Sequence, residues 1–174
     1  MSEKKKSYGK EFEHQVYKNF SEIGNVSIDR IPDQVTKYRG SSRNICDFIV
    51  YDKPNLIYLE CKTVHGSTLP FSNIRENQWN GLLEKSKIDG VIAGIMCWFI
   101  DHDITEFIPI QALEILKNEQ NAKSLKWETV FIVSYDEDGK ERERFHMPVI
   151  GGKKKRIMFE YDMKDFLAQI KNNT

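Results

Sequence analysis

The chain has 174 residues, of which 40% are hydrophobic and 30% are charged, a composition typical of a globular protein with one core. Its 26 basic and 26 acidic residues cancel, so only local clusters of charge can argue for a polyanionic partner. No apolar run reaches the roughly 18 residues that span a bilayer, and the basic N-terminus lacks the apolar segment of a secretory signal. The cysteines, Cys46, Cys61 and Cys97, lack the paired spacing of a zinc site, and we interpret them as reduced core thiols of a cytoplasmic protein.

The first half of the chain alternates helical and strand patterns. Its patterns predict, in chain order, a helix over 10–23, a short strand near 26–30, strands over 45–52 and 56–64, and a helix over 72–88. The apolar residues of the first helix form one stripe, and Glu13 lies at the edge of that stripe. Ser72 is the expected N-cap of the second helix.

The second half continues this alternation. Its patterns predict strands over 90–100 and 104–110, a helix over 111–119, a hairpin turning at Gly151-Gly152, and a helix from about Asp162. Residues 65–71 read as a loop. The order of elements indicates an α/β fold in which helices flank a central mixed β-sheet. We expect a single domain over residues 1–174, with residues 1–7 as a flexible basic tail.

Two polar residues end the otherwise apolar stretch "LIYLECK" at 56–62. Glu60 and Lys62 point to the same side of a strand, and Asp47 lies in the facing half of the preceding strand. Two adjacent carboxylates repel unless one is protonated or a cation lies between them, and Mg²⁺ suits such oxygen ligands. Lys62 would then stabilise charge on a phosphate or hold an attacking water. The alternative is a surface Glu–Lys pair, which contributes little.

Two further residues extend this pattern. Glu13 can supply a third carboxylate from the edge of its helix. Gln78, on the helix that follows the Glu60 strand, can orient a water or a phosphate oxygen. Each has a structural explanation when taken singly, as a solvated helix residue and as an amide at a helix–sheet boundary. It is the combination that favours a catalytic site.

Together these residues resemble a known family. A helix with Gly9 and Glu13, then Asp47, "ECK" at 60–62, and "LPFSNIRENQ" ending in Gln78 resemble the PD-(D/E)XK nuclease superfamily. Within it, the chain is similar to the RecU-type Holliday junction resolvases and their phage-borne relatives. The resemblance extends over about residues 8–110, and the "ECK" strand followed by "LPFSNIRENQ" is its most specific part.

The resemblance implies a restriction-endonuclease-like fold, a homodimer, Mg²⁺ or Mn²⁺ as cofactor, and nicking of four-way DNA junctions. It implies a catalytic set made of Glu13, Asp47, Glu60 and Lys62, assisted by Gln78. The implied metal ligands are Asp47, Glu60 and the carbonyl of Cys61. It also places the protein in the cytoplasm of a bacterial cell, encoded by the host or by a phage. The chain departs from the pattern at Cys46, where a proline is expected, and in the short segment before Asp47.

Local basic clusters would contact DNA phosphates in such a protein, in a sequence-independent way. They are Lys37, Arg39 and Arg43 before the Asp47 strand, and Lys154, Lys155 and Arg156 near the predicted hairpin. Each cluster alone is more typical of a solvated tail or turn. Two other functions stay open: a nuclease of the restriction or repair type acting on linear duplex, and an inactive DNA-binding module on the same scaffold. Neither a membrane nor a small-molecule cofactor is expected.

Overall fold

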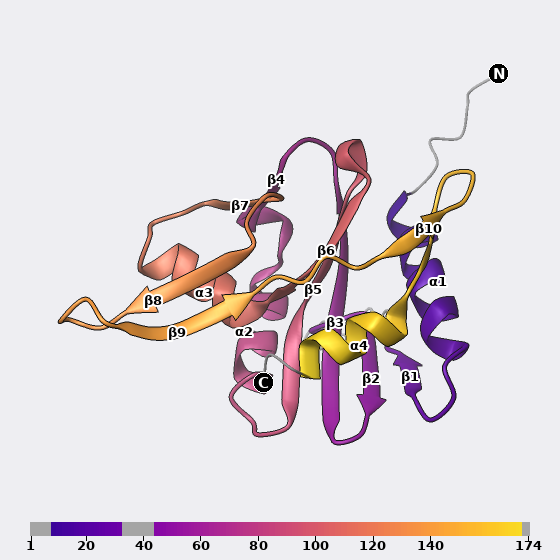
Figure 1. Cartoon of the computed structure of the whole chain (residues 1–174), viewed down its shortest axis with the longest axis horizontal. Helices are drawn as coiled ribbons and strands as arrows, with labels where there is room; N and C mark the ends of the chain where they lie inside the picture. Colours follow the sequence, from indigo (N-terminus) through magenta and orange to yellow (C-terminus); the bar gives the residue numbers. More distant parts are fainter. Residues whose placement is uncertain (1–7, 33–43, 172–174) are drawn as a thin grey trace, which may run out of the picture.

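The computed structural model describes residues 8–32 and 44–171, and it is built around one mixed β-sheet (Figure 1). The strand order is β1-β2-β3-β5-β6, with β3 and β5 parallel and the other neighbours antiparallel. The strands of this sheet are β1 (Ser27–Arg30), β2 (Phe48–Asp52), β3 (Asn55–Val64), β5 (Val91–Phe99) and β6 (Ile104–Pro109). The expected α/β class with a central mixed sheet is confirmed.

Four helices of the described chain cover the two faces of the sheet, and apolar residues fill the space between the sheet and the helices on each face. The helices are α1 (Tyr8–Ser21), α2 (Glu76–Lys85), α3 (Ile110–Asn118) and α4 (Met163–Lys171). One core cluster contains residues of α1 and α4, and the other contains residues of α2 and α3. In α1 the predicted stripe is confirmed, because Phe12, Val16 and Phe20 are fully buried. None of the helices in the described ranges is long and apolar enough to cross a membrane.

Short strand pairs complete the fold outside the main sheet. They are β4 (Thr68–Pro70) with β7 (Ser124–Lys126), β8 (Phe131–Tyr135) with β9 (Glu141–His146), and β10 (Gly152–Lys154) with β11 (Phe159–Tyr161). The β8–β9 hairpin projects from one end of the molecule (Figure 1). Strand β4 lies within 65–71, where only a loop is predicted, and pairing with the distant β7 explains why local patterns miss it.

Two predicted features, the N-cap of α2 and the turn at Gly151-Gly152, are wrong. Ser72 is not the N-cap of α2, because it lies in a 3₁₀ turn and the helix begins only at Glu76. Gly151-Gly152 is not a turn, because Gly152 lies in β10 opposite Tyr161. A Cβ atom on Gly152 would lie 3.0 Å from the Glu160 carbonyl oxygen, so glycine permits a close approach of two strands there.

The cysteines Cys46, Cys61 and Cys97 are buried and unpaired, as predicted. Burial raises the pKa of the Cys46 thiol to about 12, and the carboxylates of Glu60 and Asp47 add to this rise. A thiol with such a pKa stays protonated at neutral pH and is a poor nucleophile. The cysteine side chains therefore serve packing.

Candidate active site

Strand β3 carries the central residues of the candidate site. Successive side chains of a strand point to opposite faces of the sheet, so residues two apart share a face. Glu60 and Lys62 lie on the face covered by α2, whereas Cys61 packs into the core that contains α1. The Lys62 side chain is 18% exposed and that of Glu60 is 3% exposed. The pair is therefore largely buried, and the alternative of a surface salt bridge is wrong.

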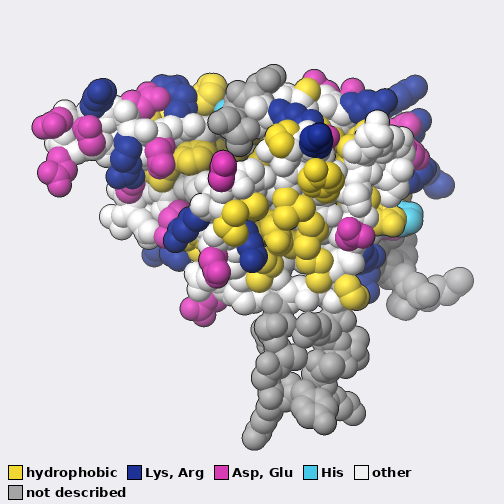
Figure 2. Space-filling view, turned by 90° about the horizontal axis from the view of Figure 1, so that it is seen from below, with side chains coloured by type: hydrophobic (Ala, Val, Ile, Leu, Met, Phe, Trp, Pro, Cys, Tyr) yellow, Lys and Arg dark blue, Asp and Glu magenta, His cyan; other side chains and the backbone are white. Residues whose placement is uncertain are grey.

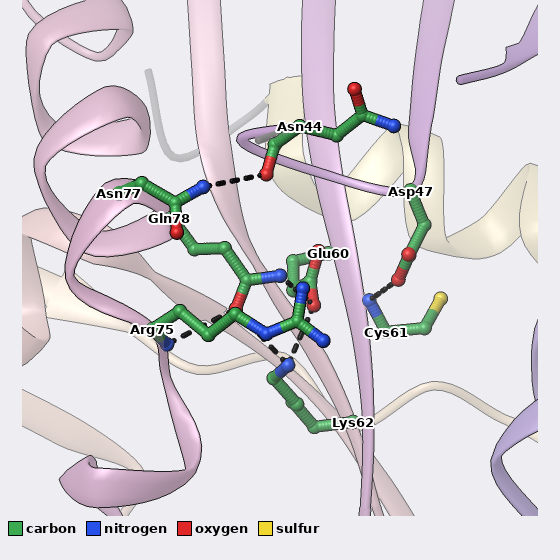
Figure 3. A network of polar contacts seen from close by, with 8 residues as sticks. All are labelled: Asn44, Asp47, Glu60, Cys61, Lys62, Arg75, Asn77 and Gln78. Carbon is green, nitrogen blue, oxygen red and sulfur yellow. Dashed lines mark hydrogen bonds and ion pairs between the residues drawn. The ribbon is translucent and has the colours of Figure 1, made fainter. Parts of the chain in front are cut away.

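One oxygen of Glu60 organises the network in Figure 3. Its Oε1 accepts a hydrogen bond from Lys62 Nζ at 2.6 Å and another from Gln78 Nε2 at 2.6 Å. Its Oε2 is buried and has no hydrogen-bond partner within the described residues. A buried carboxylate oxygen without a partner is costly in a folded protein, so it marks a place where a ligand can bind.

The side-chain amide of Gln78 is held in one orientation by its neighbours. Its Oε1 accepts from Lys62 Nζ at 3.2 Å and from the backbone N–H of Arg75 at 3.1 Å. Because Oε1 has two donors, Nε2 is the atom that faces Glu60. Gln78 is 5% exposed, and it ties the start of α2 to the polar end of β3.

Asp47 lies where the ladder between β2 and β3 ends. The last register pair is Phe48 with Leu59, and beyond it Asp47 Oδ2 accepts from the backbone N–H of Cys61 at 2.8 Å. In a strand the N–H and C=O of one residue point to the same edge, so the Cys61 carbonyl points towards the Asp47 side as well. This places Asp47 and the Cys61 carbonyl on one edge of β3, next to Glu60.

Glu13 lies apart from this network, on α1, which packs on the opposite face of the sheet. Its Oε2 pairs with Arg30 Nη2 of β1 at 2.7 Å. Burial raises the pKa of the Cys61 thiol, and the charges of Asp47, Glu60 and Glu13 add to this rise in decreasing order. Glu13 is therefore near enough to act electrostatically at Cys61.

Burial and, to a lesser extent, the negative charge of Asp47 raise the pKa of Glu60, which is about 7. Lys62 and Gln78 act in the opposite direction, because a positive charge and hydrogen bonds favour the ionised carboxylate. A carboxylate whose pKa is raised by burial and by a second carboxylate is typical of a functional site.

A comparison with models of protein families identifies the family of this chain. The model of the family RecU, described as recombination protein U, matches residues 1–140. The chain belongs to the RecU family. RecU proteins are bacterial Holliday junction resolvases, and such resolvases are endonucleases that act in recombination. The expected family and function class are thereby confirmed.

A solved structure is also similar. It is the 1.6 Å resolution structure of Hjc from Archaeoglobus fulgidus, a Holliday junction resolvase from an archaeal hyperthermophile. The two chains are 16% identical with a TM-score of 0.42, and the match covers 60% of this chain and 78% of Hjc. A search of curated proteins finds no match.

RecU-family resolvases are typically metal-dependent, and the donor set on β3 fits a hard divalent cation. Asp47 and Glu60 supply carboxylate oxygens, and Glu60 Oε2 lacks a partner in the described part of the chain. Across the described residues, no group of three or more His, Cys, Asp or Glu side chains is arranged to hold a metal.

The predicted DNA-contacting residues fall into two groups. Lys154, Lys155 and Arg156 are exposed on the hairpin formed by β10 and β11. Lys154 pairs with Asp103, and Lys155 pairs with Glu160 at 2.7 Å. The other cluster, Lys37, Arg39 and Arg43, lies outside the described residues, as does the predicted tail 1–7.

Sequence reasoning missed two residues of the network. Arg75 donates its backbone N–H to Gln78, and Asn77 Nδ2 donates to the Asn44 carbonyl oxygen at 2.8 Å. The second contact ties α2 to the segment that leads into β2. Both residues lie in "NIRENQ", directly before Gln78. A signal was present, because a glutamine three residues after a helix boundary is typical of a capping box.

Proposed function

We propose that this RecU-family protein hydrolyses phosphodiester bonds of four-way DNA junctions, with Asp47, Glu60 and Lys62 as its reactive residues. The observation that supports this most is the arrangement at Glu60 Oε1, which lies 2.6 Å from both Lys62 Nζ and Gln78 Nε2. Burying a Glu–Lys pair costs desolvation energy, and apolar residues of similar volume are often at least as stable. A chemical role explains why the pair is kept.

The proposed cofactor is Mg²⁺, for which Mn²⁺ can substitute. Asp47, Glu60 and the Cys61 carbonyl would hold it. A bound divalent ion of this kind polarises a phosphate oxygen and lowers the pKa of a bound water. Glu13 would contribute a third carboxylate, directly or through water, when Arg30 releases it.

The protein residues then act on the phosphate and the attacking water. Lys62 donates from Nζ to the attacking water or to the charge that develops on the phosphate. Gln78 holds Lys62 and Glu60 in place through both ends of its amide. Because Lys62 is 18% exposed, its ammonium can be reached from solvent while Glu60 stays buried.

The proposed substrate is branched DNA, and the exposed β10–β11 hairpin would contact its phosphates. The ion pairs of Lys154 and Lys155 are exposed, so they contribute little and can exchange for phosphate contacts. Symmetric nicking needs two sites, so we also propose a homodimer. Figure 2 shows hydrophobic side chains gathered in the middle of one face, a feature typical of surfaces that bind another protein.

A cleavage assay tests this function. Wild-type protein is incubated with a labelled four-way junction or a linear duplex of matched sequence, in Mg²⁺ or in EDTA. We expect cleavage of the junction in Mg²⁺ only, and loss of cleavage but not of junction binding in Lys62→Ala. The control is Lys87→Ala, which removes an exposed charge beyond the far end of α2.

Three outcomes contradict parts of the proposal. Equal cleavage of the linear duplex would favour a restriction-type or repair-type nuclease. Junction binding without cleavage in any divalent ion would favour an inactive DNA-binding module. Full activity in Lys62→Ala would refute the assignment of Lys62, and a monomer in sedimentation of the active protein would refute the homodimer.

A further inference from the structure

We propose that Arg75, the residue before α2, binds the phosphate that is cleaved and does so beside Lys62. This inference rests on the nuclease function proposed above and adds a residue that contacts the substrate. The inference is supported by the position of Arg75 and by the absence of an ionic partner for it among residues 8–32 and 44–171.

The position of Arg75 is fixed by an atom of the site itself. Gln78 Oε1 accepts from the Arg75 backbone N–H at 3.1 Å and from Lys62 Nζ at 3.2 Å. A single oxygen atom therefore bridges the Arg75 backbone and the Lys62 ammonium. In Figure 3 the Arg75 side chain extends across the network towards Glu60 and Lys62, and not away from it.

The charge of Arg75 is available for a ligand. Arg75 is exposed, and its guanidinium forms no ion pair with any residue in the described ranges. The other cations near the site are engaged, because Lys62 lies 2.6 Å from Glu60 and Arg30 lies 2.7 Å from Glu13. Arg75 therefore provides a positive charge at the site that no carboxylate of the described chain neutralises.

The chemistry of a guanidinium suits a phosphodiester. Its planar fork can donate two parallel hydrogen bonds to phosphate oxygens, which a lysine cannot do. A phosphate approaching the site meets the carboxylates of Asp47 and Glu60, and a nearby cation offsets their repulsion. Arg75 also directly precedes the ten-residue helix α2, whose first N–H groups favour an anion.

The test compares Arg75→Ala, Arg75→Lys and the control Lys87→Ala in two assays on the four-way junction. In single-turnover cleavage with Mg²⁺ and saturating protein, we expect about a 100-fold loss for Arg75→Ala and partial recovery for Arg75→Lys. In binding with EDTA, we expect Arg75→Ala to lower the slope of log affinity against log salt by about one. Lys87→Ala should match the wild type in cleavage.

The unfolding temperatures and the cleavage rates of the variants together distinguish the possible outcomes. The alanine variant keeps the backbone N–H that holds Gln78, so its unfolding temperature should equal that of the wild type. Cleavage by Arg75→Ala within about twofold of wild type, with Lys62→Ala inactive, would overturn this inference and leave the proposed function standing. A lowered unfolding temperature without recovery in Arg75→Lys would assign Arg75 a folding role and also overturn it. An inactive wild type would refute the proposed function, and this inference with it.

Discussion

Two buried glutamates on the same sheet have different surroundings. Glu60 on β3 and Glu106 on β6 are each 2% exposed, and each has an Oε2 without a partner in the described chain. Burial raises the pKa of Glu60 to about 7 and that of Glu106 to about 8. Glu60 has an amine and an amide at 2.6 Å from its Oε1, whereas the pKa of Glu106 is shifted by burial alone.

The two surroundings show what distinguishes the candidate site from a merely buried acid. In the sheet register Lys62 lies beside Cys97, and Cys97 lies beside Glu106, so the two regions are two strands apart. Glu106 lines a cavity of about 490 Å³ together with His146 and Trp127. A raised pKa alone would select both carboxyls. The Lys62–Gln78 network selects only Glu60.

The largest expected effect tests the difference between Glu60 and Glu106 directly. Glu60→Gln should lower the junction cleavage rate by about 10²–10³-fold, because a neutral amide neither balances Lys62 nor binds a divalent cation well. Glu106→Gln should leave the rate within about twofold of wild type. Single-turnover cleavage in Mg²⁺ measures both, and a large loss in Glu106→Gln would place the second glutamate in the reaction.

A smaller effect on cleavage should come from the residue that positions the network. Gln78→Ala removes the amide that holds both Lys62 and Glu60, so we expect about a 10–100-fold loss in rate. The matched control is Gln111→Ala, whose amide bonds the Ser86 carbonyl oxygen at 3.3 Å on another helix. Equal rates for the two variants would remove Gln78 from the proposed mechanism.

Glu106 should instead appear in the pH dependence of stability. Its pKa is about 8 in the folded protein against an ordinary value of 4.5, which the unfolded chain retains. Between these values the folded state holds a proton that the unfolded chain has released, so the free energy of unfolding falls as pH rises. The loss is complete above about pH 8.

Glu106→Gln removes this titration and therefore tests it. The variant should be more stable than wild type at pH 9 by up to about 5 kcal/mol, the free energy that corresponds to a shift from 4.5 to about 8, and the two should converge below about pH 4.5. Urea unfolding of both proteins across this range is the measurement. A constant difference between them at all pH values would show that Glu106 keeps an ordinary pKa.

The smallest expected effect is that of replacing an exposed carboxylate. Asp103 pairs with Lys154 in solvent, so Asp103→Asn should change the free energy of unfolding by less than about 0.5 kcal/mol. Removing this partner frees Lys154 for phosphate, so junction binding should strengthen slightly. Urea unfolding and a binding titration at fixed salt check both statements. A destabilisation above about 1 kcal/mol would contradict the view that the pair is weak.

Much of the fold follows from periodic patterns in the sequence. The apolar stripe of α1 and the apolar runs of β3 and β5 predict their elements because each buries a continuous face. Strand β4 lacks such a pattern, since it is defined by pairing with β7 more than 50 residues later. The start of α2 was misplaced because the Gln78 side chain, and not Ser72, satisfies the backbone at that end.

Only part of the candidate site can be predicted from the sequence. Spacing places Glu60 and Lys62 on one face, and the structure confirms that they share it. Spacing could not reveal that Glu13 pairs with Arg30, because that contact depends on how α1 packs against β1. It could not single out Glu106 either, because a lone glutamate in "ITEFIPI" does not indicate burial or a cavity.

The amide of Gln78 also determines where this chain can be lengthened without harm. It pins the first turn of α2 to β3, so an insertion between 74 and 78 would shift the helix against Lys62 and Glu60. The far end of the same helix runs into residues 87–90, all of which are exposed. Extra residues there would lengthen a surface turn and leave the network in place. Fusion partners or affinity tags placed inside the chain therefore belong at 87–90.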